Sequence, residues 1–184
     1  LWSEELFMEK LFFAILLLLV ILAAPYFYKL YGLEKITLQD IPSKGDWVKL
    51  SRGNIYFEWF LPENLETSKG TMVLVHGFST PSFVWGGLIN NFTDAGYKVL
   101  VYDHFGRGFS ERPWIKYDKN LYLETLRELI LSQDIQEEVH LVGYSMGGPI
   151  VGYYADTYPE ATRSVSLIAP AGFSMSIPET SSWT

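Results

Sequence analysis

Short apolar runs alternate with segments of helical spacing along most of this chain of 184 residues. Strands that alternate with helices form a mostly parallel sheet with right-handed crossovers, so the pattern predicts an α/β fold with helices on both faces. Ligands bind such sheets at the carboxyl ends of the strands. Four runs have the apolar composition of buried strands: 71–75, 98–102, 139–142 and 165–168.

The remaining segments have helical or hairpin patterns. Three of them have the spacing of helices that cover a sheet: 83–95, 121–131 and 147–158. Ahead of the first buried run, apolar side chains largely alternate from Trp47 to Trp59, with a turn at 51–54. Alternation around such a turn predicts a β-hairpin.

Residues 11–28 form an uncharged apolar stretch that Lys10 and Lys29 enclose. As an α-helix these residues would span roughly 27 Å, which is about the thickness of the hydrocarbon core of a membrane. Tyrosines and lysines follow the stretch, as suits a lipid–water interface. We therefore expect residues 1–31 to form a single-pass membrane anchor.

Two other interpretations of this stretch stay open. A cleaved signal peptide usually has a basic start and small residues at its cleavage site, whereas this segment has Glu4 near its start and a poor site at 23–25. A buried helix of a soluble protein is the other, although such helices seldom lack polar residues. Because Lys29, Lys35 and Lys44 follow the span, the larger domain is expected on the cytoplasmic side.

The composition excludes several classes of protein. A hydrophobic share of 48% is too high for a disordered chain, and a net charge of −7 without a basic run argues against binding to nucleic acid. The absence of cysteine excludes disulfides, a thiol nucleophile and cysteine-ligated metals. No metal-ligand cluster is visible, and the glycines at 106 and 108 lack dinucleotide-binding spacing. We therefore predict neither a cofactor nor a metal.

A Gly-x-Ser-x-Gly pentapeptide occupies 143–147, between a predicted strand and a predicted helix. A sharp turn at this point forces the central residue, Ser145, into a strained conformation and requires neighbours without side chains. The start of the helix places unpaired N–H groups beside the hydroxyl. The alternative is a glycine-rich helix start with an N-capping serine, but the strand-to-helix setting favours a catalytic nucleophile.

Three segments together resemble a known family. His76-Gly77-Phe78 follows the first buried strand, DHFGRGFS at 103–110 follows the second, and GYSMGG at 143–148 follows the third. In this order they resemble the α/β-hydrolase fold family, over about 47–173. The chain is most similar to its serine-nucleophile branch, which contains monoacylglycerol lipases, esterases and carbon–carbon bond hydrolases. A membrane-anchored monoacylglycerol lipase type also shares the apolar N-terminal span.

The resemblance implies roles for the matching residues. Ser145 corresponds to the catalytic nucleophile, which forms an acyl-enzyme. The backbone N–H groups of Phe78 and Met146 correspond to the two donors of the oxyanion hole. Phe78 also lies where substrate binds, and Phe83 and Trp85 are candidates for lining an acyl pocket.

None of the three histidines is expected to be the general base. The resemblance implies that His76 holds the oxyanion loop through hydrogen bonds. His104 sits among turn glycines, which favours a turn role over a place at the mouth of the pocket. His140 falls inside a predicted strand, where a core or edge position is expected. The resemblance implies that Asp103 shapes its turn rather than completing a triad. We expect Arg107 to be a surface or loop-pairing cation.

No triad acid or histidine stands out after Ser145. The acids that follow it are Asp156, Glu160 and Glu179. Only Glu179 lies beyond the fourth predicted strand, and no histidine follows Ser145. In the family a lid and the remaining strands come after that strand. We therefore expect a C-terminally truncated hydrolase core at 47–173, after a linker at 32–46 and before the start of a lid at 174–184.

These observations predict a membrane-tethered serine hydrolase that cleaves carboxylic esters. A membrane tether suits a lipid-like substrate such as a monoacylglycerol. One alternative is a non-catalytic membrane-bound binding or scaffold protein of the same fold. Others are a carbon–carbon bond hydrolase and a secreted hydrolase with its signal peptide still attached. Serine rather than aspartate at the turn argues against haloalkane dehalogenases and epoxide hydrolases.

Overall fold

The computed structural model describes residues 2–31 and 45–172. They form two units, an N-terminal helix and a domain built on a sheet, and each is described by itself. The predicted start of a lid at 174–184, with Glu179, lies outside the described residues. So does most of the predicted linker, whose last two residues, Gly45 and Asp46, already belong to the first strand.

The N-terminal unit is one helix, α1 (Trp2–Tyr31). Its large apolar side chains from Leu6 to Phe27 are exposed. The segment Glu4–Lys29 is long and apolar enough to cross a membrane, a test of length and composition that a signal sequence also passes. The helix that the uncharged stretch predicts is therefore present.

The second unit contains a six-stranded sheet in the order β1-β2-β4-β3-β5-β6. β1 pairs with β2, and β2 with β4, in antiparallel fashion, while β4, β3, β5 and β6 are parallel. The mostly parallel sheet and the hairpin are thus confirmed. The strands are β1 (Gly45–Leu50), β2 (Gly53–Phe60), β3 (Thr71–Val75), β4 (Lys98–Tyr102), β5 (Val139–Tyr144) and β6 (Thr162–Ile168).

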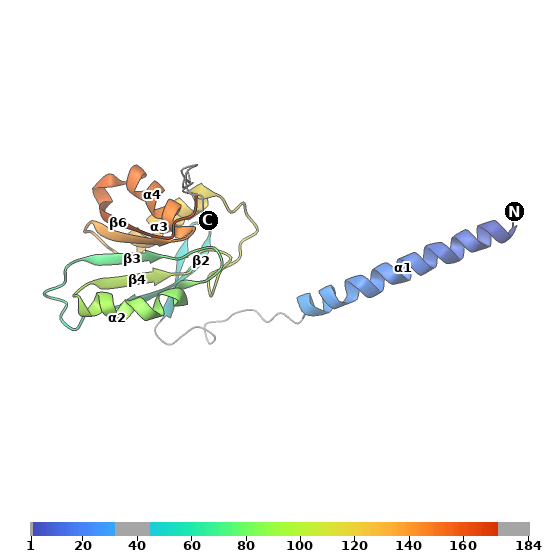
Figure 1. Cartoon of the computed structure of the whole chain (residues 1–184), viewed down its shortest axis with the longest axis horizontal. Coiled ribbons are helices and arrows are strands. Elements are labelled where there is room, and N and C mark those ends of the chain that lie inside the picture. The colour runs from blue at the N-terminus through green and yellow to red at the C-terminus, as the bar shows by residue number, and fades with distance from the viewer. Residues whose placement is uncertain (1, 32–44, 173–184) are drawn as a thin grey trace, which may run out of the picture. The chain divides into compact units, whose positions relative to one another are not determined.

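Helices cover both faces of this sheet (Figure 1). α2 (Gly86–Asp94) lies on one face, and α3 (Lys119–Ser132) and α4 (Gly147–Thr157) lie on the other. Neighbouring strand residues point to opposite faces, so Leu141 joins the core under α3 and α4 while Val142 joins the core under α2. Each such side chain contributes about 1.5–3 kcal/mol by leaving water.

Two helix boundaries differ from the predicted ones. α3 begins earlier because the Asp118 carboxylate caps it, accepting hydrogen bonds from the N–H groups of Asn120 and Leu121 at 3.1 Å each. The segment predicted as a helix over 83–95 opens instead with a separate 3-10 turn, Ser82–Trp85, before α2 begins.

The two last parallel strands differ in burial. Leu141 on β5 is fully buried, whereas its register partner on β6, Val165, is 38% exposed, and Leu167 is 42% exposed. Within the described residues, β6 pairs with β5 alone. The described part of the sheet therefore has an open, partly apolar margin at β6.

Candidate active site

Ser145 stands at the junction of β5 and α4, where the chain turns sharply from strand to helix. Its φ of 51° lies in the left-handed region that residues with a side chain seldom adopt. Hydrogen bonds hold the turn. The Ser145 N–H donates to the Ile168 carbonyl at 3.0 Å, and the Ser145 carbonyl accepts from the N–H groups of Gly148 at 3.0 Å and Ala171 at 2.9 Å. Strain of this kind at the carboxyl edge of a parallel sheet indicates a functional site.

Two glycines let neighbouring backbones pass the turn. A Cβ on Gly143 would lie 2.5 Å from the carbonyl oxygen of Gly147, and a Cβ on Gly147 would lie 2.0 Å from the carbonyl oxygen of Val75. Both atoms belong to the backbone and have little room to move aside. The requirement for glycine at the flanks of the pentapeptide is confirmed.

The loop after β3 lies directly against the Ser145 side chain. A Cβ on Gly77 would stand 3.0 Å from Cβ of Ser145 and 3.4 Å from its Oγ. The loop comes this close because Gly77 has no side chain. The N–H groups of the next residue, Phe78, and of Met146 donate no hydrogen bond to another described residue. Within the described part of the chain, both N–H groups are therefore available to an external acceptor.

Two histidines hold this loop. The His104 N–H donates to Nε2 of His76 at 3.0 Å, which fixes the His76 proton on Nδ1. The protonated Nδ1 of His76 then donates to the Gly77 carbonyl at 2.7 Å. Nε2 of His104 donates to the His76 carbonyl at 3.1 Å, and the ring centroids lie 4.1 Å apart. The expected role of His76 in holding the loop is confirmed, and His104 shares it rather than serving only its own turn.

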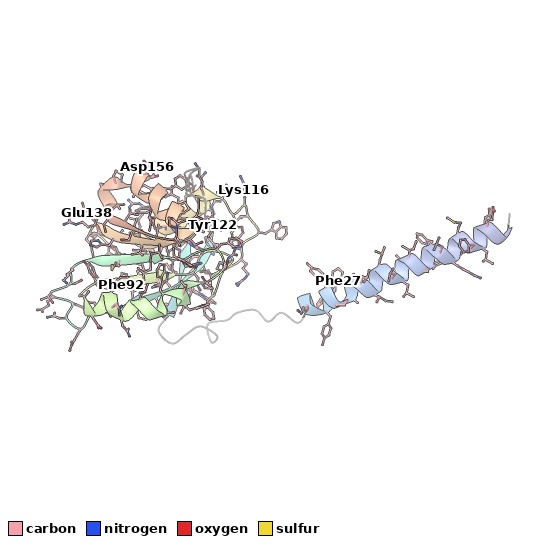
Figure 2. The ribbon with its side chains drawn as sticks, viewed as in Figure 1. Phe27, Phe92, Lys116, Tyr122, Glu138 and Asp156 are labelled. Carbon is pink, nitrogen blue, oxygen red and sulfur yellow. The ribbon has the colours of Figure 1, made fainter. Side chains whose placement is uncertain are left out.

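Burial keeps both rings neutral. His76 and His104 are fully buried, and burial lowers the pKa of each below the usual 6.5. Nδ1 of His104 has no hydrogen-bond partner among the described residues, so a proton placed there would lack an acceptor. Two tyrosines lie edge-on to the His104 ring, each with its centroid 5.1 Å away: Tyr102 of β4 and Tyr122 of α3, which Figure 2 labels.

Asp103 shapes the loop that carries His104. Its buried carboxylate accepts hydrogen bonds from the N–H groups of Ser82 at 2.7 Å and Phe109 at 2.9 Å. Gly108 passes so close that a Cβ there would lie 1.8 Å from a carboxylate oxygen. The expected turn-shaping role of Asp103 is confirmed.

Arg107 joins this loop to the loop after β3. Its Nε donates to the Phe78 carbonyl at 2.6 Å, and its guanidinium carbon lies 4.3 Å from the centroid of the Phe78 ring. Nη1 donates to the Gly106 carbonyl at 3.1 Å. The sequence indicates a loop-pairing cation, but it does not show that the partner is Phe78. The sequence signal that points to this contact is the position of Arg107 between two glycines, in the loop after β4, the strand that pairs with β3.

The Ser145 hydroxyl makes no hydrogen bond to another described residue. His76 and His104 use their rings within the two loops, and Nδ1 of His140 pairs with the Ser164 hydroxyl at 2.7 Å. Asp156, labelled in Figure 2, is exposed on α4. The described residues thus bring a loop with a free N–H group to Ser145, but no general base.

The aromatic candidates divide into two groups. Phe78 and Phe83 are 61% and 73% exposed, whereas Trp85 is 2% exposed and packs edge-on to the Tyr144 ring at 6.3 Å. The expectation for Trp85 is therefore corrected, because it belongs to the core under α2. Among the described residues, no three His, Asp or Glu side chains are grouped as metal ligands.

The chain is similar to known hydrolases. A family model described as the alpha/beta hydrolase fold matches residues 70–184. Lipase 1 of Psychrobacter immobilis is 33% identical over 117 residues, which cover 60% of this chain and 35% of the lipase. An esterase from Exiguobacterium antarcticum superposes with a TM-score of 0.62 at 24% identity, over 70% of this chain and 46% of the esterase.

A bromoperoxidase from Bacillus anthracis also has a similar structure. It superposes with a TM-score of 0.59 at 28% identity, over 68% of this chain and 44% of the bromoperoxidase. Lipase 1 of Psychrobacter immobilis and Lipase 3 of Moraxella sp. are each covered to 35% of their length. This chain therefore spans about a third of the length of the curated relatives that it matches.

Proposed function

The chain belongs to the α/β-hydrolase fold family, and we propose that this protein is a serine hydrolase that cleaves carboxylic esters through an acyl-enzyme on Ser145. One observation carries the proposal: the strained turn of Ser145 meets a loop so near that a Cβ on Gly77 would lie 3.4 Å from the Ser145 hydroxyl oxygen. A nucleophile beside free N–H groups is the arrangement that acyl transfer requires.

The N–H groups of Phe78 and Met146 are the proposed oxyanion donors. Met146 immediately precedes α4, where the partial positive charge of the helix start favours a negative oxygen. Loss of one such donor typically costs about 3 kcal/mol of transition-state stabilisation. The exposed Phe78 ring is the proposed contact for the acyl chain.

The reaction proceeds in two balanced halves. Oγ of Ser145 bonds to the ester carbon, the carbonyl electron pair moves onto its oxygen, and the hydroxyl proton passes to a general base. The tetrahedral species then expels the alcohol, which leaves with that proton. Water repeats these steps on the acyl-enzyme and releases the acid, restoring the serine. The base is a group other than the three histidines, whose rings are engaged elsewhere or buried.

We infer a lipid-like ester, such as a monoacylglycerol, as the substrate. The support is α1, whose apolar surface suits a single-pass anchor, together with the lipases among the relatives. The lysines that follow the span favour a cytoplasmic position for the larger domain. An enzyme held at a membrane meets esters that partition into the same phase.

A direct test is hydrolysis of p-nitrophenyl esters and monoacylglycerols of increasing chain length by the intact natural protein. Ser145→Ala is expected to lower kcat at least about 10⁴-fold, because the nucleophile is lost. Ser166→Ala, which changes an exposed serine on β6, serves as the matched control and leaves kcat within about twofold. Undiminished hydrolysis by the Ser145 variant would overturn the proposal.

A non-catalytic membrane-bound scaffold of the same fold is the second candidate. It is favoured by one observation, that no described residue forms a hydrogen bond with the Ser145 hydroxyl. A folded intact protein that turns over no ester would support it. Cleavage of a diketone, but of no ester, would instead indicate a carbon–carbon bond hydrolase.

A further inference from the structure

Arg107 makes two contacts with one residue, and they hold different parts of it. Its Nε donates to the carbonyl of Phe78 at 2.6 Å, and its guanidinium group lies over the Phe78 ring with 4.3 Å from carbon to centroid. A third contact, from Nη1 to the Gly106 carbonyl at 3.1 Å, keeps the arginine on its own loop. The planar guanidinium allows donation along its edge and stacking on its face at once.

These contacts restrict the N–H group of Phe78. The ring holds Cβ and the hydrogen bond holds the carbonyl carbon, and both are attached to the same tetrahedral Cα as the amide nitrogen. Holding two of the three heavy-atom substituents of Cα leaves the third, the amide nitrogen, little freedom to turn. This matters because 61% of the Phe78 residue is exposed, so packing alone does not fix it.

The same loop fixes the preceding residues by other means. His104 bonds to the ring and the carbonyl of His76, and the Arg107 N–H donates to the His104 carbonyl at 3.0 Å. The loop after β4 therefore holds the start of the loop after β3 through His104 and its exposed end through Arg107. The first contact is buried and the second lies at the surface, so a change at Arg107 affects Phe78 while leaving the core intact.

We propose that Arg107 is a positioning residue, which holds the Phe78 N–H in the orientation that binds the oxyanion. The inference rests on the proposed function of Ser145 and Phe78. A hydrogen-bond donor displaced by about 1 Å can cost about a hundredfold in rate, so the effect falls on the chemical step rather than on substrate binding.

The test is steady-state hydrolysis of a p-nitrophenyl ester by Arg107→Gln in the intact natural protein. We expect kcat to fall about 10–100-fold with KM within about threefold of the wild type, because the donor acts mainly in the transition state. Inhibition by phenylboronic acid, whose serine adduct carries an oxygen in the oxyanion position, should weaken by a similar factor.

The matched control is Arg112→Gln. Arg112 lies on the same loop and donates to the carbonyls of Ser110 and Gly108, both at 3.1 Å, without a hydrogen bond to the loop after β3. Its substitution should leave kcat within about twofold. An equal loss of kcat in the two variants would overturn the proposal, since the loop would then need its arginines only for folding. An unchanged kcat in Arg107→Gln would overturn it as well.

Arg107→Lys decides the case if the glutamine variant does not fold. Lysine keeps the charge and a donor but has no planar group to stack on the ring. Its kcat should therefore be lower than that of the wild type but higher than the range expected for the glutamine variant. A fully active lysine variant would contradict the role of the two-point contact. Ser145→Ala separates the two proposals. If the Ser145 variant still hydrolyses the ester, the proposed function is wrong. If hydrolysis is lost in Ser145→Ala while the Arg107 variants are as active as the wild type, only the role of Arg107 is wrong.

Discussion

The two sides of Ser145 are held very differently by the described residues. On the side of β3, the loop from His76 to Phe78 is fixed by hydrogen bonds from His104 and Arg107 and rests on a buried carboxylate network. On the side of β6, the strand is largely exposed, and its end is tied to Ser145 by two backbone hydrogen bonds, at Ile168 and Ala171.

This difference matters for the proposed function, because a serine hydrolase has two separate tasks at its nucleophile. Stabilising an oxyanion needs a rigid loop beside the nucleophile, and the described residues supply one. Activating the nucleophile needs a base, and no described residue on the β6 side provides it. The described residues therefore build the side that we propose to bind the oxyanion, and four predictions test how far the contrast between the two sides holds.

The largest effect is expected where a new side chain meets the rigid side. Gly147→Ala would place a Cβ 2.0 Å from the Val75 carbonyl, and we expect it to lower the free energy of unfolding by about 3–5 kcal/mol. Gly148→Ala meets Pro170 on the β6 side at 2.6 Å and should cost less. Gly152, with open space around it on α4, is the control, and its change to Ala should stabilise by about 0.5–1 kcal/mol. Equal costs for the first two variants, measured by urea denaturation, would contradict the contrast.

A second comparison uses two residues that are paired in the sheet. Leu141→Ala on β5 should cost about 2–5 kcal/mol because it empties a fully buried site. Val165→Ala on β6 should cost less than about 1 kcal/mol because the side chain is already partly in water. Chemical denaturation of this chain measures both, and a cost at Val165 that matches the cost at Leu141 would show that β6 is as well packed as β5.

A third effect appears on acidification. The pKa values of folded His76 and His104 lie below 6.5, so below that pH the unfolded rings take up protons that the folded rings refuse. The free energy of unfolding should therefore fall as pH drops from 6.5, by up to about 1.4 kcal/mol per pH unit for each ring, and this dependence should vanish above 6.5.

Two variants assign the acid effect to its residues. His104→Gln should reduce the slope below pH 6.5 more than His76→Gln does, because burial lowers the pKa of His104 well below its usual value. Denaturation curves at a series of pH values supply the slopes. A slope that is unchanged in His104→Gln would contradict this expectation.

The smallest effect is expected at the amino ends of the strands, far from Ser145 along β5. A hydrogen bond from Lys98 at 2.6 Å lowers the pKa of Glu137 to about 2, yet both side chains are partly exposed. Glu137→Gln should therefore cost less than about 1 kcal/mol at neutral pH, a contribution that is present above pH 4.5 and is lost toward pH 2. Thermal melting measures this change in stability. A loss of stability as large as that of Leu141→Ala would contradict the expectation of a weak surface pair.

The sequence predicts the parts that depend on local pattern. Apolar runs mark the strands, and the glycines around Ser145 mark its turn, because each follows from the chemistry of neighbouring residues. Pairings between distant loops have no such signature, so the contact from Arg107 to Phe78 emerges only when the fold places β3 beside β4. The same limit explains Trp85, whose place in the core under α2 includes a contact with Tyr144, a residue far away in the sequence.

The most direct measurement of the central claim is the site of covalent attachment of a fluorophosphonate to the intact protein. Attack by a serine hydroxyl on phosphorus forms a P–O bond and releases fluoride, so the adduct marks the activated nucleophile. Tandem mass spectrometry should find it on Ser145 in the wild type and on no residue in Ser145→Ala. An adduct on a different serine, or labelling that persists in Ser145→Ala, would contradict the assignment of Ser145 as the nucleophile.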